Sequence, residues 1–223
     1  MKKFICIALM TAFASFLTAC VQLNVGMDVI TGSGPMVSQD FDVGSFNSIN
    51  VTGNFIIIWR ESPDAAVTID AQQNILDNFN VTVRGNVLHV GAQRGHMVTG
   101  DYTPRLYIYT PYIAGITTSG SATASDWDTV RVQEFSVNVS GAADMSLDFD
   151  VESIDIRISG SASIDFIGNI SSAIINLSGA GSIDISVIDY LDVDLSGAVH
   201  VRYRGSPTVT SRISGVGTVR QVN

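Results

Sequence analysis

Apolar and polar residues alternate one by one along much of the chain. In the second half, apolar residues lie at every other position before a recurrent Ser-Gly dipeptide, as Val137 and Val139 do. Another apolar residue follows each Ser by five positions, as Ile164 and Ile183 do. Because successive side chains of a strand point to opposite faces, a period of two residues predicts strands with one apolar face. The pattern therefore predicts a strand, a turn at Ser-Gly and a second strand.

The Ser-Gly dipeptide recurs six times at spacings of 18 to 21 residues. Its glycines are Gly120, Gly141, Gly160, Gly179, Gly197 and Gly215. A repeat of ~19 residues is too short for a strand-helix-strand unit, which needs at least ~30. The repeat predicts an all-β, single-domain β-solenoid, β-helix-like, with about 18–21 residues per coil and parallel ladders between coils. We expect the glycines at corners, with positive φ and no room for a Cβ atom. The alternative is an antiparallel β-sandwich with regularly spaced turns.

The first half, residues 21–111, lacks the repeat but also predicts strands. These are expected at 46–51, 55–59, 66–69, 80–83 and 87–90. Residues 71–77 are the one stretch expected to form a helical turn, and residues 91–100 are the best candidate for a mobile loop.

Residues 1–19 predict a lipoprotein signal peptide that is removed before folding. Lys2 and Lys3 precede an apolar run, Phe4 to Phe16, that is too short to span a bilayer as a helix. The tetrapeptide Leu17-Thr-Ala-Cys20 resembles the bacterial lipobox, in which cleavage occurs before a diacylglycerol-modified Cys. The sequence therefore predicts lipidation at Cys20.

The predicted anchor determines the remaining domain boundaries and the location. A Cys20 with several acyl chains, palmitate among them, would tether the protein to a membrane that it does not cross. The absence of Asp directly after Cys20 favours the outer membrane of a Gram-negative bacterium. We expect residues 20–40 to form the lipidated N-terminus and its tether, and residues 41–223 to form the solenoid. Because Cys6 lies in the signal peptide, no disulfide is expected in the mature chain.

Charge excludes one class of partner. Residues 20–223 contain ten arginines, no lysine and 21 acidic residues. A surface that binds nucleic acid needs clustered cations, so we expect no nucleic-acid partner.

If the coils stack in register, residues at equal offsets from the Ser form columns. Six residues after the Ser, the column contains Asp165, Asp184 and Arg202, and Asp184 should pair with Arg202 across the ladder. Neighbouring carboxylates repel unless a proton, a cation or an arginine relieves them. Asp165 and Asp184 are thus a weak Ca²⁺ candidate, although Ca²⁺ needs six to eight oxygen ligands. Their spacing also suits a retaining glycosidase. A solvated acidic face shared with Arg202 is the simplest interpretation.

A second column lies two residues before the Ser. It contains Asn138, Arg157, Asn176, Asp194 and Arg212. Asp194 and Arg212 are expected to be neighbours across the ladder. The sequence shows no catalytic constellation, and no cofactor is expected.

Several short motifs follow one another over residues 41–223: Phe41-Asp-Val-Gly-Ser-Phe46, Asn74-Ile-Leu76, Val81-Thr-Val83, the Ser-Gly units and Gly205-Ser-Pro207. In this order they resemble the GIN domain family, which is described as an auto-transporter adhesin head domain and is common in surface lipoproteins of Bacteroidota and relatives. The resemblance implies a β-helix-like solenoid, and the family offers no established catalytic residues.

The sequence as a whole predicts a non-enzymatic envelope lipoprotein that presents an acidic solenoid surface to a glycan, matrix or envelope partner. The alternative is an enzyme that acts on polysaccharide, since β-helices also carry lyases and pectinases; that alternative is an analogy of fold.

Overall fold

The computed structural model describes residues 28–222. The strands are β1 (Asp28–Thr31), β2 (Met36–Phe41), β3 (Ser48–Glu61), β4 (Ala66–Gln72), β5 (Phe79–Arg84), β6 (Val87–Ala92), β7 (His96–Thr99), β8 (Arg105–Thr110), β9 (Gly115–Ala124), β10 (Val130–Ser186), β11 (Tyr190–Arg204) and β12 (Thr208–Gln221). Within residues 28–222 there is one short helix, α2 (Gln73–Leu76), which lies within the predicted helical turn. The prediction of an all-β chain is confirmed.

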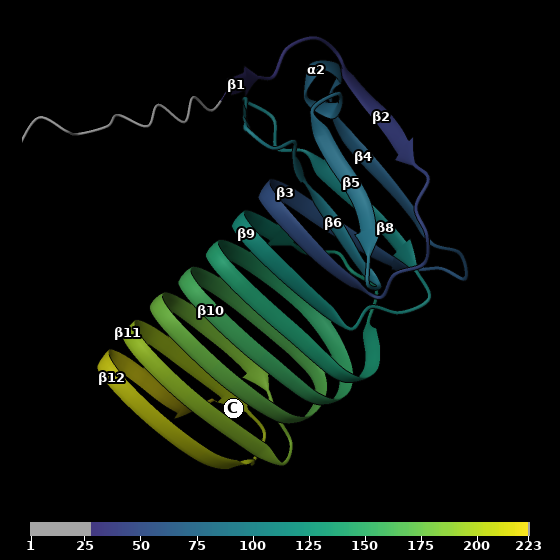
Figure 1. Cartoon of the computed structure of the whole chain (residues 1–223). Coiled ribbons are helices and arrows are strands. Elements are labelled where there is room, and N and C mark those ends of the chain that lie inside the picture. Colours follow the sequence, from purple (N-terminus) through teal and green to yellow (C-terminus); the bar gives the residue numbers. More distant parts are fainter. Residues whose placement is uncertain (1–27, 223) are drawn as a thin grey trace, which may run out of the picture.

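Ten strands form one mixed sheet with the order β12-β11-β10-β9-β3-β8-β4-β2, and β6 and β5 branch from β3. The stack of turns is formed by β3, β9, β10, β11 and β12, while β2, β4, β5, β6 and β8 gather at the end opposite β12 (Figure 1). We call this second group, together with β1, β7 and α2, the head. Within residues 28–222, no helix has the length and apolar character needed to cross a membrane.

The Ser-Gly repeats pair in parallel and in register. Ser119 pairs with Ser140 between β9 and β10, and Ser178 pairs with Ser196 between β10 and β11. Ser196 pairs in turn with Ser214 of β12. An antiparallel sandwich would join successive repeats by antiparallel pairing. The parallel register therefore excludes that alternative for this half of the chain.

All six repeat glycines have positive φ, between +120° and +138°. At Gly160, φ is +137°, and a Cβ atom would lie 2.0 Å from the carbonyl oxygen of Gly141. No real Cβ contact is that short, so a side chain would have to force two turns of backbone apart. Glycine is required here by both the backbone conformation and the close approach of the next turn.

The repeat extends into the first half of the chain, which the sequence analysis did not predict. Thr52 and Gly53 of β3 pair in register with Ser119 and Gly120 of β9, and Gly53 has φ +118°. The opposite edge of β3 pairs with β6 and then with β8. β3 is therefore both the first turn of the stack and the strand that joins it to the head.

Two segments of the head differ from expectation. Residues 28–41, expected to belong largely to a tether, form β1 and β2, and β2 pairs antiparallel with β4 while Val37 and Phe41 pack against the core. Residues 91–100, expected to be a loop, contain β7, which pairs in parallel with β1. The three strands β1, β2 and β7 are short, each has a Gly or Pro directly beside it, and their pairing depends on partners far away in the chain. The predicted signal peptide and Cys20 lie outside the described residues.

The alternating apolar residues fill the space inside the turns. Phe135, Phe149 and Phe166 stack on one another, with ring centroids 5.1 Å and 4.9 Å apart. Each is almost fully buried. Burying a side chain of this kind contributes roughly 1.5–3 kcal/mol, whereas an exposed ion pair contributes at most ~1 kcal/mol. The fold is thus stabilised mainly by its apolar columns.

We predict that Gly160→Val destabilises the protein by about 3 kcal/mol or more, because it adds strain at positive φ to a backbone collision. Urea denaturation followed by circular dichroism measures the change. Ser163→Ala, on the exposed side of the same turn, is the control and should alter stability by less than about 0.5 kcal/mol. A Gly160→Val protein as stable as the control would refute the proposed close stacking at this corner.

Candidate functional site

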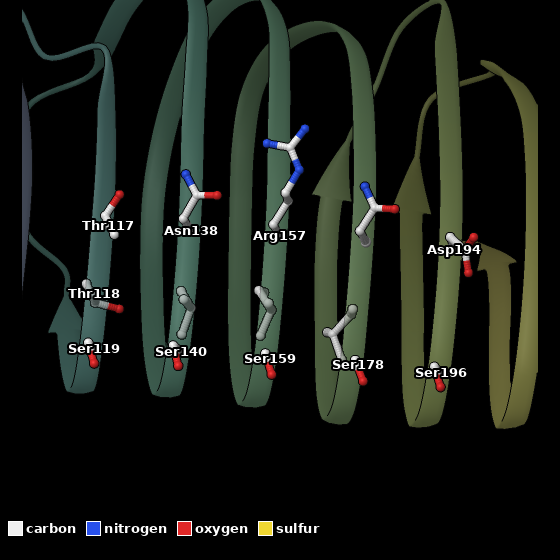
Figure 2. A pocket seen from close by; sticks show the side chains of 14 residues that line it. Thr117, Thr118, Ser119, Asn138, Ser140, Arg157, Ser159, Ser178, Asp194 and Ser196 are labelled. Carbon is white, nitrogen blue, oxygen red and sulfur yellow. The ribbon is translucent and has the colours of Figure 1, made fainter.

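A groove of about 450 Å³ runs across five successive turns, along the strand segments that precede the Ser-Gly corners. Two polar columns border it (Figure 2). The first is the serine column, Ser119, Ser140, Ser159, Ser178 and Ser196. The second, which we call the mixed column, is Thr117, Asn138, Arg157, Asn176 and Asp194. No single repeat builds this groove, since each turn contributes one member to each column.

The local sequence explains why the groove has an apolar floor. In four of the five turns the strand segment ends in a polar residue, an apolar residue and then Ser-Gly, and in the first turn the buried Thr118 takes the apolar position. Val139, Ile158 and Leu177, the middle residues of three successive turns, are buried and also line the groove. The residues on either side of them point outward because side chains alternate along a strand. Stacking in register converts this short motif into two polar rows above an apolar strip.

The two columns can make many hydrogen bonds and carry little net charge. Side-chain amides offer donors and acceptors, and hydroxyls offer both. Successive turns lie ~4.8 Å apart, so these groups recur at a fixed spacing along the stack. Arg157 forms an ion pair with Asp155 of the same strand, which offsets its charge. The arrangement suits an extended polar ligand that lies across the turns.

The structure brings Asp184 and Arg202 together, in the predicted register and as an ion pair. The side chain of Asp184 is only 13% exposed. The hydrogen bond from Arg202 to Asp184 and the charge of Asp184 raise the pKa of Arg202, burial lowers it, and the charge of Asp165 raises it further. Arg202 therefore stays protonated throughout the neutral range and offsets both carboxylates.

The proposed Ca²⁺ site at Asp165 and Asp184 gains no third Asp, Glu, His or Cys ligand from the described part of the chain. Within residues 28–222, no three or more His, Cys, Asp or Glu side chains are grouped so that they can hold a metal ion. Asp184 already accepts a hydrogen bond from Arg202. A Ca²⁺ site built of oxygens would have to displace this guanidinium. The solvated face shared with arginine remains the simplest account of the pair.

Asp194 and Arg212 are direct neighbours across the β11–β12 ladder, as expected. The ion pair of Arg212 is made with a different carboxylate, since its Nη1 lies 3.8 Å from Oδ1 of Asp192. Asp192 lies two residues before Asp194 and so points to the same face of β11. This diagonal pairing leaves Asp194 exposed at the edge of the groove.

The repeat in the sequence predicted most of the mixed column but not the groove that it borders. The missed member is Thr117, which pairs with Asn138 across the β9–β10 ladder. A second cavity, of about 460 Å³, was also missed: it lies in the head and is lined in part by Phe55, Phe79 and Met97. Its walls come from β3, β5 and β7, and no sequence pattern showed that these strands meet.

Comparison with solved structures supports the same fold. A putative adhesin from Bacteroides fragilis is 19% identical, with a TM-score of 0.69, over 86% of this chain and 100% of the other. A putative adhesin from Parabacteroides distasonis is 24% identical, with a TM-score of 0.56, over 87% and 100%. A putative lipid binding protein from Parabacteroides distasonis is 17% identical, with a TM-score of 0.61, over 88% and 100%. At these identities the likeness concerns the fold alone.

No curated protein matches the chain. Residues 45–223 match the family described as "Putative auto-transporter adhesin, head GIN domain". The match begins just before β3 and includes every turn of the stack, which agrees with the motifs quoted above. The chain belongs to the GIN domain family.

Proposed function

We propose that the protein is a non-enzymatic envelope lipoprotein whose β-solenoid binds an extended ligand in the groove between the serine column and the mixed column. The observation that carries this proposal is the groove itself, which repeats one polar motif across five turns. The adhesin description of the family agrees with a binding role.

A glycan is the ligand class that best fits the groove. Sugar hydroxyls both donate and accept hydrogen bonds, and so do the hydroxyls and amides of the two columns. The apolar floor formed by Val139, Ile158 and Leu177 suits the less polar faces of a sugar ring. A polymer lying along the stack would contact several turns at once, so weak contacts with each turn would add together.

The anchor determines how the groove is presented. If Cys20 carries the lipid, seven residues separate it from Asp28, the first residue of β1. The eight residue-to-residue steps from Cys20 to Asp28 span at most about 26–29 Å when fully extended. The head would then lie near the outer membrane, and the stack of turns would extend away from it, with β12 at the far end (Figure 1).

We predict that membrane-extracted protein begins at an acylated Cys20 and that Cys20→Ser releases the protein from the membrane fraction, because two or more acyl chains are needed for stable anchoring. Mass spectrometry of the N-terminal peptide and cell fractionation measure these outcomes. Wild-type protein with an unmodified Cys20 would contradict the lipid anchor without bearing on the groove.

We also predict that the purified protein binds neutral polysaccharides on a glycan array, and that the double variant Asn138→Ala, Asn176→Ala weakens that binding about tenfold or more. Losing two sets of hydrogen bonds, at roughly 0.5–1.5 kcal/mol each, accounts for a change of this size. Asn80→Ala, an exposed amide in the head, is the matched control. Equal binding by the double variant and the control would exclude the groove as the site, and release of reducing ends from a bound glycan would contradict the non-enzymatic role.

A further inference from the structure

The two ends of the chain differ sharply in charge. All 21 acidic residues lie at or before Asp194. The last 29 residues contain none, yet they carry four of the ten arginines present after the predicted signal peptide: Arg202, Arg204, Arg212 and Arg220. A basic surface therefore ends an otherwise acidic stack.

The change of sign occurs within a single face of the stack, on the strand segments that follow the Ser-Gly corners. Asp165 and Asp184 lie six residues after the Ser of two successive turns. In the next two turns the same position holds Arg202 and Arg220. This face lies on the other side of the corners from the groove proposed to bind glycans. The two surfaces can therefore act independently.

A cavity of about 440 Å³ lies at the basic end of this face. Its lining residues are Ser182, His200, Arg202, Thr218 and Arg220, all of them polar. β11 and β12 place His200 beside Thr218 and Arg202 beside Arg220. Nδ1 of His200 and Oγ1 of Thr218 lie 2.9 Å apart, which fixes the orientation of the imidazole ring. Ser182 of β10 lies beside His200, so the cavity is built from side chains of three adjacent strands.

The guanidiniums of Arg202 and Arg220 differ in whether a carboxylate balances their charge. Arg202 pairs with Asp184. Among residues 28–222, no carboxylate oxygen lies within 4.0 Å of Arg220 to form an ion pair. Like charges directly opposite each other on a ladder repel, so Arg202 and Arg220 destabilise one another. An anionic group between them would relieve this repulsion and could accept paired hydrogen bonds from a planar guanidinium.

We propose that this cavity binds the carboxylate or sulfate group of an acidic polysaccharide. This inference rests on the proposed role in glycan binding and adds a second, charge-selective site to it. Arg220 and Arg202 would hold the anionic oxygens, and the hydroxyls of Ser182 and Thr218 would bind neighbouring sugar hydroxyls. The cavity is open to solvent at the surface of the last turns, so a polymer can continue past it on either side.

Isothermal titration calorimetry of the purified protein at low salt tests the proposal with four probes. Polygalacturonate supplies carboxylates, dextran sulfate supplies sulfates, neutral dextran supplies neither, and inorganic sulfate supplies a free anion. We expect at least one acidic polymer to bind and Arg220→Gln to weaken it about tenfold or more, since charged hydrogen bonds contribute roughly 1.5–3 kcal/mol. Neutral dextran should not respond to this variant, and inorganic sulfate should bind far more weakly than the polymer.

Arg84→Gln, at the end of β5 in the head, removes the same charge from a different surface and is the matched control. Equal weakening by both variants would show attraction to net charge and would overturn the site. Binding of inorganic sulfate as strong as that of the polymer would overturn its assignment to a polysaccharide. If neither acidic polymer binds, the proposed site is overturned as well. In that case, a wild-type dimer that Arg220→Gln dissociates in analytical sedimentation would assign the surface to contact with a second copy of the chain. Retained binding of neutral glycans in the groove would leave the proposed function intact in each case.

Discussion

The stacking of backbone on backbone at the Ser-Gly corners is the constraint on which the rest of the structure depends. Each corner glycine lies so close to the previous turn that a Cβ atom would meet its carbonyl oxygen, at 2.0 Å for Gly160 and 2.1 Å for Gly141. This closeness keeps the ladders parallel and in register from β3 to β12. The inward residues then superpose into continuous apolar columns, and the outward residues superpose into polar ones.

Register also gives the surface its chemistry. A residue at a given offset recurs on each turn, so a small change in the repeat creates a row along the stack. The polar residue two positions before each Ser yields the mixed column, and the residue six positions after it yields a row that changes from Asp165 and Asp184 to Arg202 and Arg220. A candidate binding site on this protein is therefore a column of equivalent residues whose chemistry changes from one end of the stack to the other.

The sequence predicted the stacked turns, because there the same local motif recurs at each position that pairs with the next turn. Alternation and the Ser-Gly spacing were sufficient for the corner glycines and for the neighbours of Asp184 and Asp194. They failed at Gly53, where Thr52 replaces the serine and the head separates this turn from the next. They also failed at β1 and β7, since pairing between Asp28 and His96 leaves no local signal. The partner of Arg212 depended on side-chain orientation, which spacing alone does not determine.

Removing one whole turn tests the central claim most directly. Deletion of residues 178–195, one 18-residue repeat, joins Leu177 to Ser196 and keeps every inward position inward. The account predicts a protein that still unfolds cooperatively in urea, with a smaller m-value because less surface is buried. Deletion of residues 178–194 is one residue shorter and joins Leu177 to Leu195. This variant should not fold, because the extra residue reverses which side chains before the next corner point inward. If both deletions fold equally well, or if the whole-repeat deletion fails to fold, stacking in register does not determine this structure.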